Sequence, residues 1–295
     1  MASQLNYSPT SIMKLKDPQL VKLGVRLLVK CEYLNHPFIS GNKWWKLKYN
    51  LDEAVRQRHQ TLLTFGGAYS NHIYATAAAA KELGLKSIGI IRGEEVLPLN
   101  QTLAFAESCG MKLQYVSREE YRNKTEELFI QNLHNQFGNF YLIPEGGTNE
   151  LAVKGVAEFA SSLIKEVDFD YLCLPVGTGG TMAGLVRGFS GRKKVLGFSV
   201  LKGGGFLNDE VKTVSGVAFD NWSIIEDYHF GGYAKSTSEL INFIKEMDGQ
   251  YYLPLDRVYT SKMMFGVFDL IRKGFFEKGS TVLMLHTGGL QGRKP

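Results

Sequence analysis

Short apolar runs alternate with amphipathic stretches along most of this chain. The apolar runs, rich in β-branched residues, are RLLVKCEYL (26–34), TLLTF (61–65), SIGIIRG (87–93), KLQYVS (112–117), FYLIPEGG (140–147), YLCLPVG (171–177), KVLGFSVL (194–201), WSIIEDY (222–228) and TVLMLHTGG (281–289). Continuous apolar runs separated by helical stretches are typical of parallel sheets covered by helices. The pattern therefore predicts an α/β protein with a strand in each run.

One lysine occupies an unusual place in this pattern. Apolar positions 44, 47, 51, 54 and 55 have helical spacing, and Ser40 or Asn42 can cap the helix that they predict. Lys43 then lies in the first turn, where the positive end of the helix dipole disfavours a cation. An ammonium in such a place loses its proton easily, as an amine that attacks a carbonyl must. The alternative is that Lys43 is an ordinary solvated surface lysine. The residues predicted to lie near it must distinguish the two interpretations.

Several predicted strands run directly into glycine pairs. These segments are TFGGAYSNH, IPEGGTNE, LPVGTGGTMAG and LHTGGLQG. Any one pair can serve a sharp turn. Ligands of open α/β sheets, however, bind at the carboxyl ends of strands, where glycine allows the backbone to approach closely. Four such loops predict one substantial binding site.

The loop at residues 177–181, GTGGT, has the features of a phosphate site. Backbone N–H groups, the hydroxyls of Thr178 and Thr181 and the start of the following helix can all face an anion. A P-loop would need Lys after the last glycine, and a dinucleotide site would need a glycine where Met182 stands and an acidic residue after the next strand. Neither is present. A single phosphate together with a carbonyl-reactive Lys43 indicates pyridoxal 5'-phosphate as the cofactor.

Composition excludes several other classes of protein. The 295 residues carry a net charge of +5, and the basic residues are scattered, so we expect no nucleic acid partner. The sequence shows no signal peptide and no apolar run long enough for a membrane span, so we expect a soluble, cytoplasmic protein without a membrane partner. Three widely spaced cysteines predict neither a disulfide framework nor a zinc site, and we expect no bound metal.

Six motifs in register resemble those of a known family. They are SGNKxxKL at the lysine, GGxxSNHxxATAA at residues 66–78, PxGGT, GTGGTxAG, VYTxK and HTGG. In this order they resemble the D-cysteine desulfhydrase and 1-aminocyclopropane-1-carboxylate (ACC) deaminase family, over nearly the whole chain. The resemblance implies the tryptophan-synthase-β-like fold, called fold type II, of pyridoxal phosphate enzymes. In that fold two open, twisted parallel-sheet α/β domains hold the cofactor in the cleft between them.

The resemblance also implies a domain division and an assembly. A smaller domain would comprise residues 46–150, and residues 1–45 with 151–295 would form the large cofactor-binding domain. Such a discontinuous domain would explain why no linker is visible in the sequence. Members of the family are usually homodimers that act on a small amino-acid substrate.

The resemblance further implies individual roles. Lys43 would form the Schiff base with the cofactor, and Asn42 or Asn71 would contact its phenolic oxygen. The implied catalytic residues are Lys43, Ser70, Tyr233 and Tyr259; the cofactor-binding residues are Lys43, Asn42, Asn71, Thr178, Gly179, Gly180, Thr181, Thr260 and Thr287; the substrate-binding residues are Ser70, Asn71 and His72. His72 can instead be a capping or packing residue. The group that removes the α-proton stays open among Lys43, Tyr259 and Ser70.

Two positions bear on the choice between the reactions of the family. The deaminase pattern has Glu and Leu where this chain has Thr260 and Thr287. A carboxylate beside the pyridine nitrogen would keep it protonated and make the ring a strong electron sink, which a neutral hydroxyl cannot do. Opening a cyclopropane needs that sink, whereas a good leaving group takes its electrons away. The Thr pair therefore favours a lyase that converts D-cysteine by β-elimination to pyruvate, sulfide and ammonia.

Three other functions compete with this hypothesis. The first is ACC deaminase, which would open the ring to give 2-oxobutanoate and ammonia, and which the absence of Glu at position 260 disfavours. The second is a cofactor carrier or sensor without turnover, against which the retained Ser70, Tyr233 and Tyr259 argue. The third is a Rossmann-like nucleotide-binding protein, which lacks the required glycine and acidic residue.

Three aromatic residues depart from the family pattern. Trp45 and Tyr74 stand where Arg is common, and Tyr69 stands where Gln is common. Because such exchanges remove planar polar donors, we expect them to alter the pocket and to permit a bulkier or less polar substrate.

Overall fold

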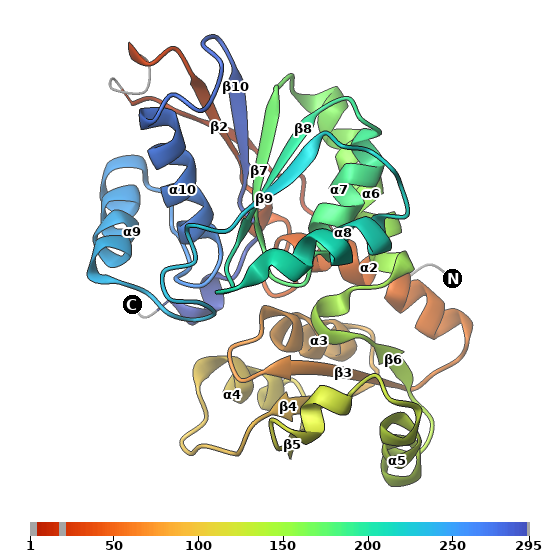
Figure 1. The fold of residues 1–295 in the computed structure, drawn as a ribbon. Helices are drawn as coiled ribbons and strands as arrows, with labels where there is room; N and C mark the ends of the chain where they lie inside the picture. The colour runs from red at the N-terminus through yellow and green to blue at the C-terminus, as the bar shows by residue number, and fades with distance from the viewer. Residues whose placement is uncertain (1–4, 18–21, 294–295) are drawn as a thin grey trace.

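Two β-sheets organise the chain in the computed structural model, which describes residues 5–17 and 22–293 (Figure 1). The larger sheet has the order β1-β2-β10-β7-β8-β9, with strands at Ile12–Leu15, Arg26–Lys30, Thr281–Leu285, Tyr171–Val176, Lys194–Ser199 and Trp222–Ile225. The smaller sheet has the order β5-β4-β3-β6, with strands at Met111–Val116, Lys86–Arg92, Thr61–Gly67 and Tyr141–Ile143. All neighbouring strands are parallel except β1 and β2. Each of the nine apolar runs contains a strand, which confirms the α/β prediction.

Helices cover both sheets (Figure 1). In the larger body α2 (Asn42–Arg56), α6 (Glu150–Glu166), α7 (Gly180–Phe189) and α8 (Leu207–Ser215) share one core cluster, while α9 (Ser238–Tyr251) and α10 (Thr260–Arg272) belong to the cluster on the opposite face. Around the smaller sheet lie α3 (Asn71–Glu82), α4 (Gln101–Ser108) and α5 (Glu127–Phe137). Short 3-10 helices occur at Glu32–Leu34, Glu120–Asn123, Glu145–Gly147, Gly204–Phe206 and Leu290–Gly292. None of the helices in the described part of the chain is long and apolar enough to cross a bilayer.

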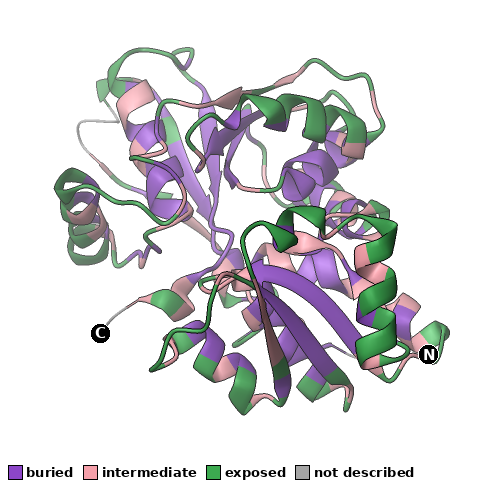
Figure 2. Ribbon diagram, turned by 60° about the horizontal axis from the view of Figure 1, so that its bottom comes forward, coloured by how far each residue is buried: buried purple, intermediate pink, exposed green. Residues whose placement is uncertain are grey.

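The central strands are buried on both faces, as Figure 2 shows. In β10, Val282 and Met284 pack into the cluster with α9 and α10, whereas Leu283 and Leu285 pack into the cluster with α6 and α7. Successive side chains of a strand point to opposite faces, so a strand with helices on both sides must be apolar at every position. This burial explains why the sequence shows continuous apolar runs.

Helix α2 makes a very close contact with α6. A Cβ atom at Gly155 of α6 would lie 2.0 Å from the carbonyl oxygen of Trp45, so only glycine fits there. The indole N–H of Trp45 donates to the buried carboxylate of Glu32 at 2.8 Å, which fixes α2 to the 3-10 helix that follows β2. The division into residues 46–150 and the rest stays a proposal. The strand assignment supports it, although its boundary at residue 46 falls inside α2.

Candidate active site

A cavity of about 630 Å³ lies between the two sheets, and we call it the central cavity. It is lined by the glycine loops that follow β3, β6, β7 and β10 and by the first turn of α2. Since these loops leave the carboxyl ends of parallel strands, the strands of both sheets point toward the same space. The four glycine loops therefore meet at one site, as their pattern predicts.

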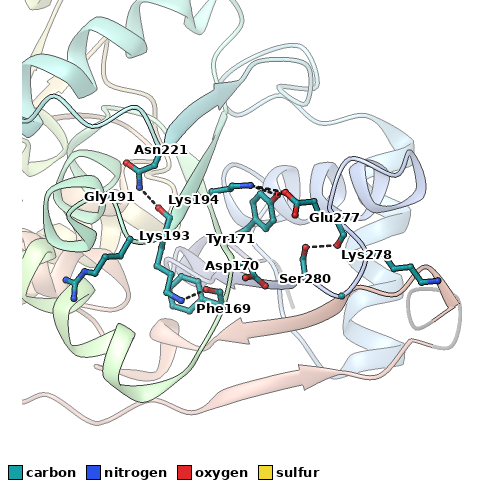
Figure 3. Close-up of a pocket in the computed structure, with 12 residues that line it drawn as sticks. Phe169, Asp170, Tyr171, Gly191, Lys193, Lys194, Asn221, Glu277, Lys278 and Ser280 are labelled. Carbon is teal, nitrogen blue, oxygen red and sulfur yellow. Dashed lines mark hydrogen bonds and ion pairs between the residues drawn. The ribbon is translucent and has the colours of Figure 1, made fainter.

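A second cavity, of about 570 Å³, lies at the other end of the large sheet, where β7 and β8 begin (Figure 3). Two of the three lysines that line it are engaged by neighbouring acids: Lys193 pairs with Asp168 at 2.8 Å and Lys194 with Glu277 at 3.1 Å. Paired, exposed charges of this kind form an ordinary solvated surface. The central cavity is therefore the candidate active site.

Lys43 lies in the first turn of α2 and lines the central cavity, as predicted. Its Nζ donates to Asn42 Oδ1 at 2.8 Å, and Asn42 Nδ2 donates to Thr181 Oγ1 at the same distance. Burial lowers the pKa of Lys43 to about 8, while the charge of Asp256 acts in the opposite direction. The loss of solvation, more than the helix dipole that the sequence suggested, makes this amine easy to deprotonate.

The expected cap of this helix is wrong. Neither Ser40 nor Asn42 caps α2; the N-cap is Gly41, with φ +69° and no side-chain hydrogen bond. A Cβ atom there would lie 2.0 Å from the carbonyl oxygen of Thr287, and that oxygen accepts the Asn42 N–H at 3.3 Å. Glycine thus lets the start of α2 pack against the HTGG loop, which places Lys43 in the cavity.

The loop after β7 leads into α7 and forms one end of the cavity. Thr178, Gly179, Gly180 and Thr181 all line it, and the first N–H groups of α7 have no intrahelical acceptor. Thr178 Oγ1 lies 2.7 Å from Thr148 Oγ1, to which Lys46 Nζ donates at 2.9 Å.

Lys46 is a site residue that the sequence reasoning missed. It is 2% exposed, and burial, together with the nearby charge of Lys43, holds its pKa well below the usual value. Its Nζ would lie 3.0 Å from a Cβ atom at Gly180, so it reaches the start of α7. A phosphate dianion here would favour the protonated form of Lys46 and would also meet two hydroxyls and a helix N-terminus, so these residues fit pyridoxal phosphate. The signal was in the sequence, since residues three apart share a helix face.

Ser70 and Asn71 occupy the start of α3. Ser70 is the N-cap, and its Oγ accepts the N–H groups of His72 at 3.2 Å and Ile73 at 3.3 Å. With its oxygen so engaged, the hydroxyl is a donor toward the cavity rather than a base. Asn71 Oδ1 accepts a hydrogen bond from Gln291, which leaves Asn71 Nδ2 without an acceptor among the described residues. Both residues thus present donors, which suits an anionic group.

His72 lines the cavity but is 1% exposed, and burial keeps its pKa well below the usual value, so it is neutral. Thr64 donates its hydroxyl hydrogen to the Ile143 carbonyl, so it must accept one from His72 Nε2 at 2.8 Å. His72 Nδ1 then carries a lone pair, and it has no partner among the described residues. Its hydrogen bond to β3 matches the packing alternative, and Ser70, not His72, caps the helix.

Tyr233 and Tyr259 face each other across the cavity wall, with their hydroxyl oxygens 3.5 Å apart. Burial raises the pKa of both phenols, that of Tyr259 well above its usual value, so both are protonated and can donate. Lys262, from the VYTxK motif, donates to the carbonyls of His229 at 2.8 Å and Gly232 at 2.7 Å. It thereby holds the loop that presents Tyr233.

The two threonines differ in position. Thr287 lines the cavity, but Thr260 is fully buried and lies behind its wall. The Thr260 hydroxyl donates to Asp256 Oδ1 at 2.6 Å. Asp256, itself 4% exposed, also accepts the backbone N–H groups of Val258, Tyr259 and Thr260 at the start of α10. Asp256 is a second residue that sequence reasoning missed, and nothing in the motif pattern marked it.

The expected effect of the three aromatic departures on the pocket is wrong, because none of them lines the central cavity. Trp45 faces Glu32 on the other side of α2, and Tyr74 stacks on Phe105 with ring centroids 3.9 Å apart. Tyr69 is 58% exposed. These residues therefore give no reason to expect a bulky substrate.

The sequence comparison agrees with this geometry. Residues 4–288 match the family model described as pyridoxal-phosphate dependent enzyme. The chain belongs to this family. Like other pyridoxal-phosphate dependent enzymes, it therefore uses pyridoxal phosphate, and Lys43, Lys46 and the 177–181 loop are where its residues fit that cofactor.

Relatives narrow the group within these pyridoxal-phosphate dependent enzymes. A Pyrococcus abyssi protein provisionally named as an ACC deaminase is 33% identical over 287 residues, which cover 92% of this chain and 86% of the relative. The mitochondrial bifunctional D-cysteine desulfhydrase/ACC deaminase of Arabidopsis thaliana is 31% identical, over 98% of this chain and 78% of its own. A solved ACC deaminase homologue superposes with a TM-score of 0.82 at 29% identity, covering 99% of this chain and 92% of its own. These matches confirm the family resemblance and fold type II.

Proposed function

We propose that this enzyme catalyses β-elimination from a small amino acid, with D-cysteine as substrate and pyruvate, sulfide and ammonia as products. The observation that carries the proposal is that Thr260 and Thr287 stand where the deaminase pattern has Glu and Leu. Of the two, Thr287 lines the cavity. A neutral hydroxyl favours a reaction in which the leaving group takes the electron pair.

We assign the described residues to the following roles in this reaction. Bound pyridoxal phosphate supplies the electron sink that acidifies the substrate's α-hydrogen. Lys43 would hold the cofactor's aldehyde, with Lys46 and the start of α7 at its phosphate. Ser70 and Asn71 would present hydrogen-bond donors to the substrate carboxylate, and the free Nδ2 makes Asn71, rather than Asn42, the better donor to the phenolic oxygen.

Lys43 is also the best candidate for the α-proton base. Its lowered pKa of about 8 leaves a substantial neutral fraction near neutral pH. Tyr259 is a protonated phenol, and the Ser70 oxygen is occupied by two backbone N–H groups. We therefore propose that Lys43 Nζ takes the proton and that Tyr259 acts as a hydrogen-bond donor.

A second candidate is ACC deamination. All three relatives described above carry that name, the Arabidopsis protein together with D-cysteine desulfhydrase, and one observation in the structure favours it. The Asp256 carboxylate accepts the Thr260 hydroxyl at 2.6 Å, which brings a negative charge within one hydroxyl of the position where the deaminase pattern has Glu. If that charge reaches the pyridine nitrogen, the electron sink is stronger than a threonine alone suggests.

The experiment that decides is a turnover assay of the purified holoenzyme with D-cysteine, L-cysteine and ACC, in which sulfide, keto acid and ammonia are measured. We expect sulfide and pyruvate from D-cysteine and little keto acid from ACC. Lys43→Ala should lose both turnover and the visible absorption of the attached cofactor. Keto acid from ACC alone would overturn the argument from the Thr pair. Absorbance without turnover of any of these substrates would favour the carrier or sensor alternative.

We also propose a homodimer, on family resemblance alone. Sedimentation of the holoenzyme at several concentrations would test it, and a single monomeric species at high concentration would contradict it.

A further inference from the structure

Arg92 is a cation in the central cavity. The proposed binding of the cofactor and of the substrate α-carboxylate does not use it. It ends β4, pairs with Gly67 in the sheet register and lines the cavity beside the loop that leads to Ser70. Its Nη2 would lie 3.5 Å from a Cβ atom at Gly67. The guanidinium is thus on the substrate side of the cavity, at the edge of the smaller sheet.

Each of the other positive groups of the cavity either pairs with an acidic side chain or has been assigned to the cofactor phosphate or the substrate carboxylate. Lys46 and the start of α7 suit the cofactor phosphate, and the start of α3 suits the substrate α-carboxylate. Lys124 pairs with Glu145 at 3.4 Å. Arg92 alone among these cations forms no ion pair or hydrogen bond within the described residues, and its side chain is exposed. The Arg92 guanidinium is therefore available to an anion that enters the cavity.

A buried aromatic ring holds this guanidinium in place. The Arg92 Cζ atom lies 5.6 Å from the ring centroid of Tyr121, and Lys124 Nζ lies 5.1 Å from the same centroid. Tyr121 is 2% exposed and packs edge-on against Phe65 of β3. A cation stacked on a fixed ring has lost part of its rotamer freedom before a ligand arrives. The contact with the ring thus restricts this exposed side chain before a ligand arrives, as an anion receptor requires.

We propose that Arg92 binds a negatively charged β-substituent of the substrate, so that the preferred substrates are amino acids whose β-substituent already carries a negative charge before it leaves. The inference rests on the proposed elimination and names its substrate class. When the bond between the β-carbon and the substituent breaks, the electron pair leaves with the substituent, and the guanidinium holds the charge that it gains. For serine O-sulfate and water the products are pyruvate, ammonium and hydrogen sulfate. The hydrosulfide from D-cysteine would use the same position.

The test compares two substrates that differ in the charge of the β-substituent before elimination. Serine O-sulfate carries an anionic substituent and β-chloroalanine a neutral one, and both enantiomers of each are given to the holoenzyme. We expect Arg92→Gln to lower the ratio of kcat/KM for the sulfate to kcat/KM for the chloride about tenfold or more. Lys86→Gln removes a charge from the other end of β4, outside the cavity, and should leave that ratio unchanged. Equal losses with both substrates would mean that Arg92 binds the α-carboxylate and would overturn the proposal, as would no loss.

A binding measurement separates this inference from the proposed reaction. Succinate and butyrate carry two and one carboxylates and no amine, so neither can be turned over. By calorimetry on the holoenzyme we expect succinate to bind about tenfold or more tightly than butyrate, and Arg92→Gln to remove that advantage. If no substrate is eliminated but this preference is found, the proposed reaction fails while the anion receptor stands. Equal binding of the two acids would overturn the receptor.

Discussion

The proton affinity of Lys43 can be measured directly, and the structure gives its expected value and the direction in which it can be changed. Burial lowers the pKa of Lys43 to about 8, against 10.5 for an ordinary lysine, and the buried charge of Asp256 raises it. At pH 7 roughly one amine in ten should be neutral, against fewer than about one in a thousand for an ordinary lysine. The reactive fraction should rise about tenfold per pH unit below the pKa and level off above it.

Competitive acetylation of the cofactor-free enzyme tests this expectation. A trace of acetic anhydride is added between pH 6 and 11 with Nα-acetyl-lysine as internal standard, and modification of Lys43 is quantified in a digest by mass spectrometry. The reactivity of Lys43 should level off between pH 8 and 9, well before that of the standard. Asp256→Asn should move the midpoint of Lys43 to lower pH, because it removes the charge that favours the ammonium. A Lys43 profile that follows the standard, or a midpoint that rises in Asp256→Asn, would refute the reasoning.

Two further expectations concern the phosphate end and the packing of α2. Because Lys46 reaches the start of α7, Lys46→Met should weaken the binding of pyridoxal phosphate about tenfold or more and the binding of pyridoxal much less. Absorbance titration of the cofactor-free enzyme measures both affinities. Equal losses for the two ligands would contradict the role of Lys46 at the phosphate. Gly155→Ala should lower the free energy of unfolding by about 3 kcal/mol, because its Cβ would lie 2.0 Å from a backbone oxygen. The matched change Gly249→Ala, in α9 with open space around the new atom, should raise it by about 0.5–1 kcal/mol. Urea unfolding measures both, and a similar shift for the two variants would show that the contact between α6 and α2 is not tight.

Local sequence patterns predict much of the fold and part of the candidate site. Strands β2, β3, β4, β7, β8 and β10 are buried along nearly their whole length, so each produced a nearly continuous apolar run. The edge strands β5, β6 and β9 are only partly buried. Lys43 was placed in the first turn of α2 because the apolar spacing after it is regular. The sequence pattern did not predict strand β1 at Ile12–Leu15. This strand has four residues, of which only Leu15 is buried. Because it lies at the edge of the sheet, it does not need a continuous apolar sequence.

Other features depend on contacts between distant segments, which local patterns do not carry. Gly41, rather than Ser40 or Asn42, is the N-cap of α2 because the Thr287 carbonyl, far along the chain, leaves no room for a side chain. Thr260 points behind the cavity wall because Asp256 accepts its hydroxyl. Trp45 turns away from the pocket because the carboxylate of Glu32 is buried beside it. In each case the partner is set by tertiary packing, so residue type alone could not decide the orientation.

The place of β10 in the large sheet has a consequence for how the protein is made. This strand lies between β2 and β7, yet it ends at Leu285, close to the end of the chain. During synthesis β1 and β2 must wait, without their parallel neighbour β10, until Leu285 has left the ribosome. The four strands of the smaller sheet span only residues 61–143 and are complete much earlier. The smaller sheet can therefore form first, and Lys43 stays exposed to solvent until the last strand enters between the two halves of the large sheet.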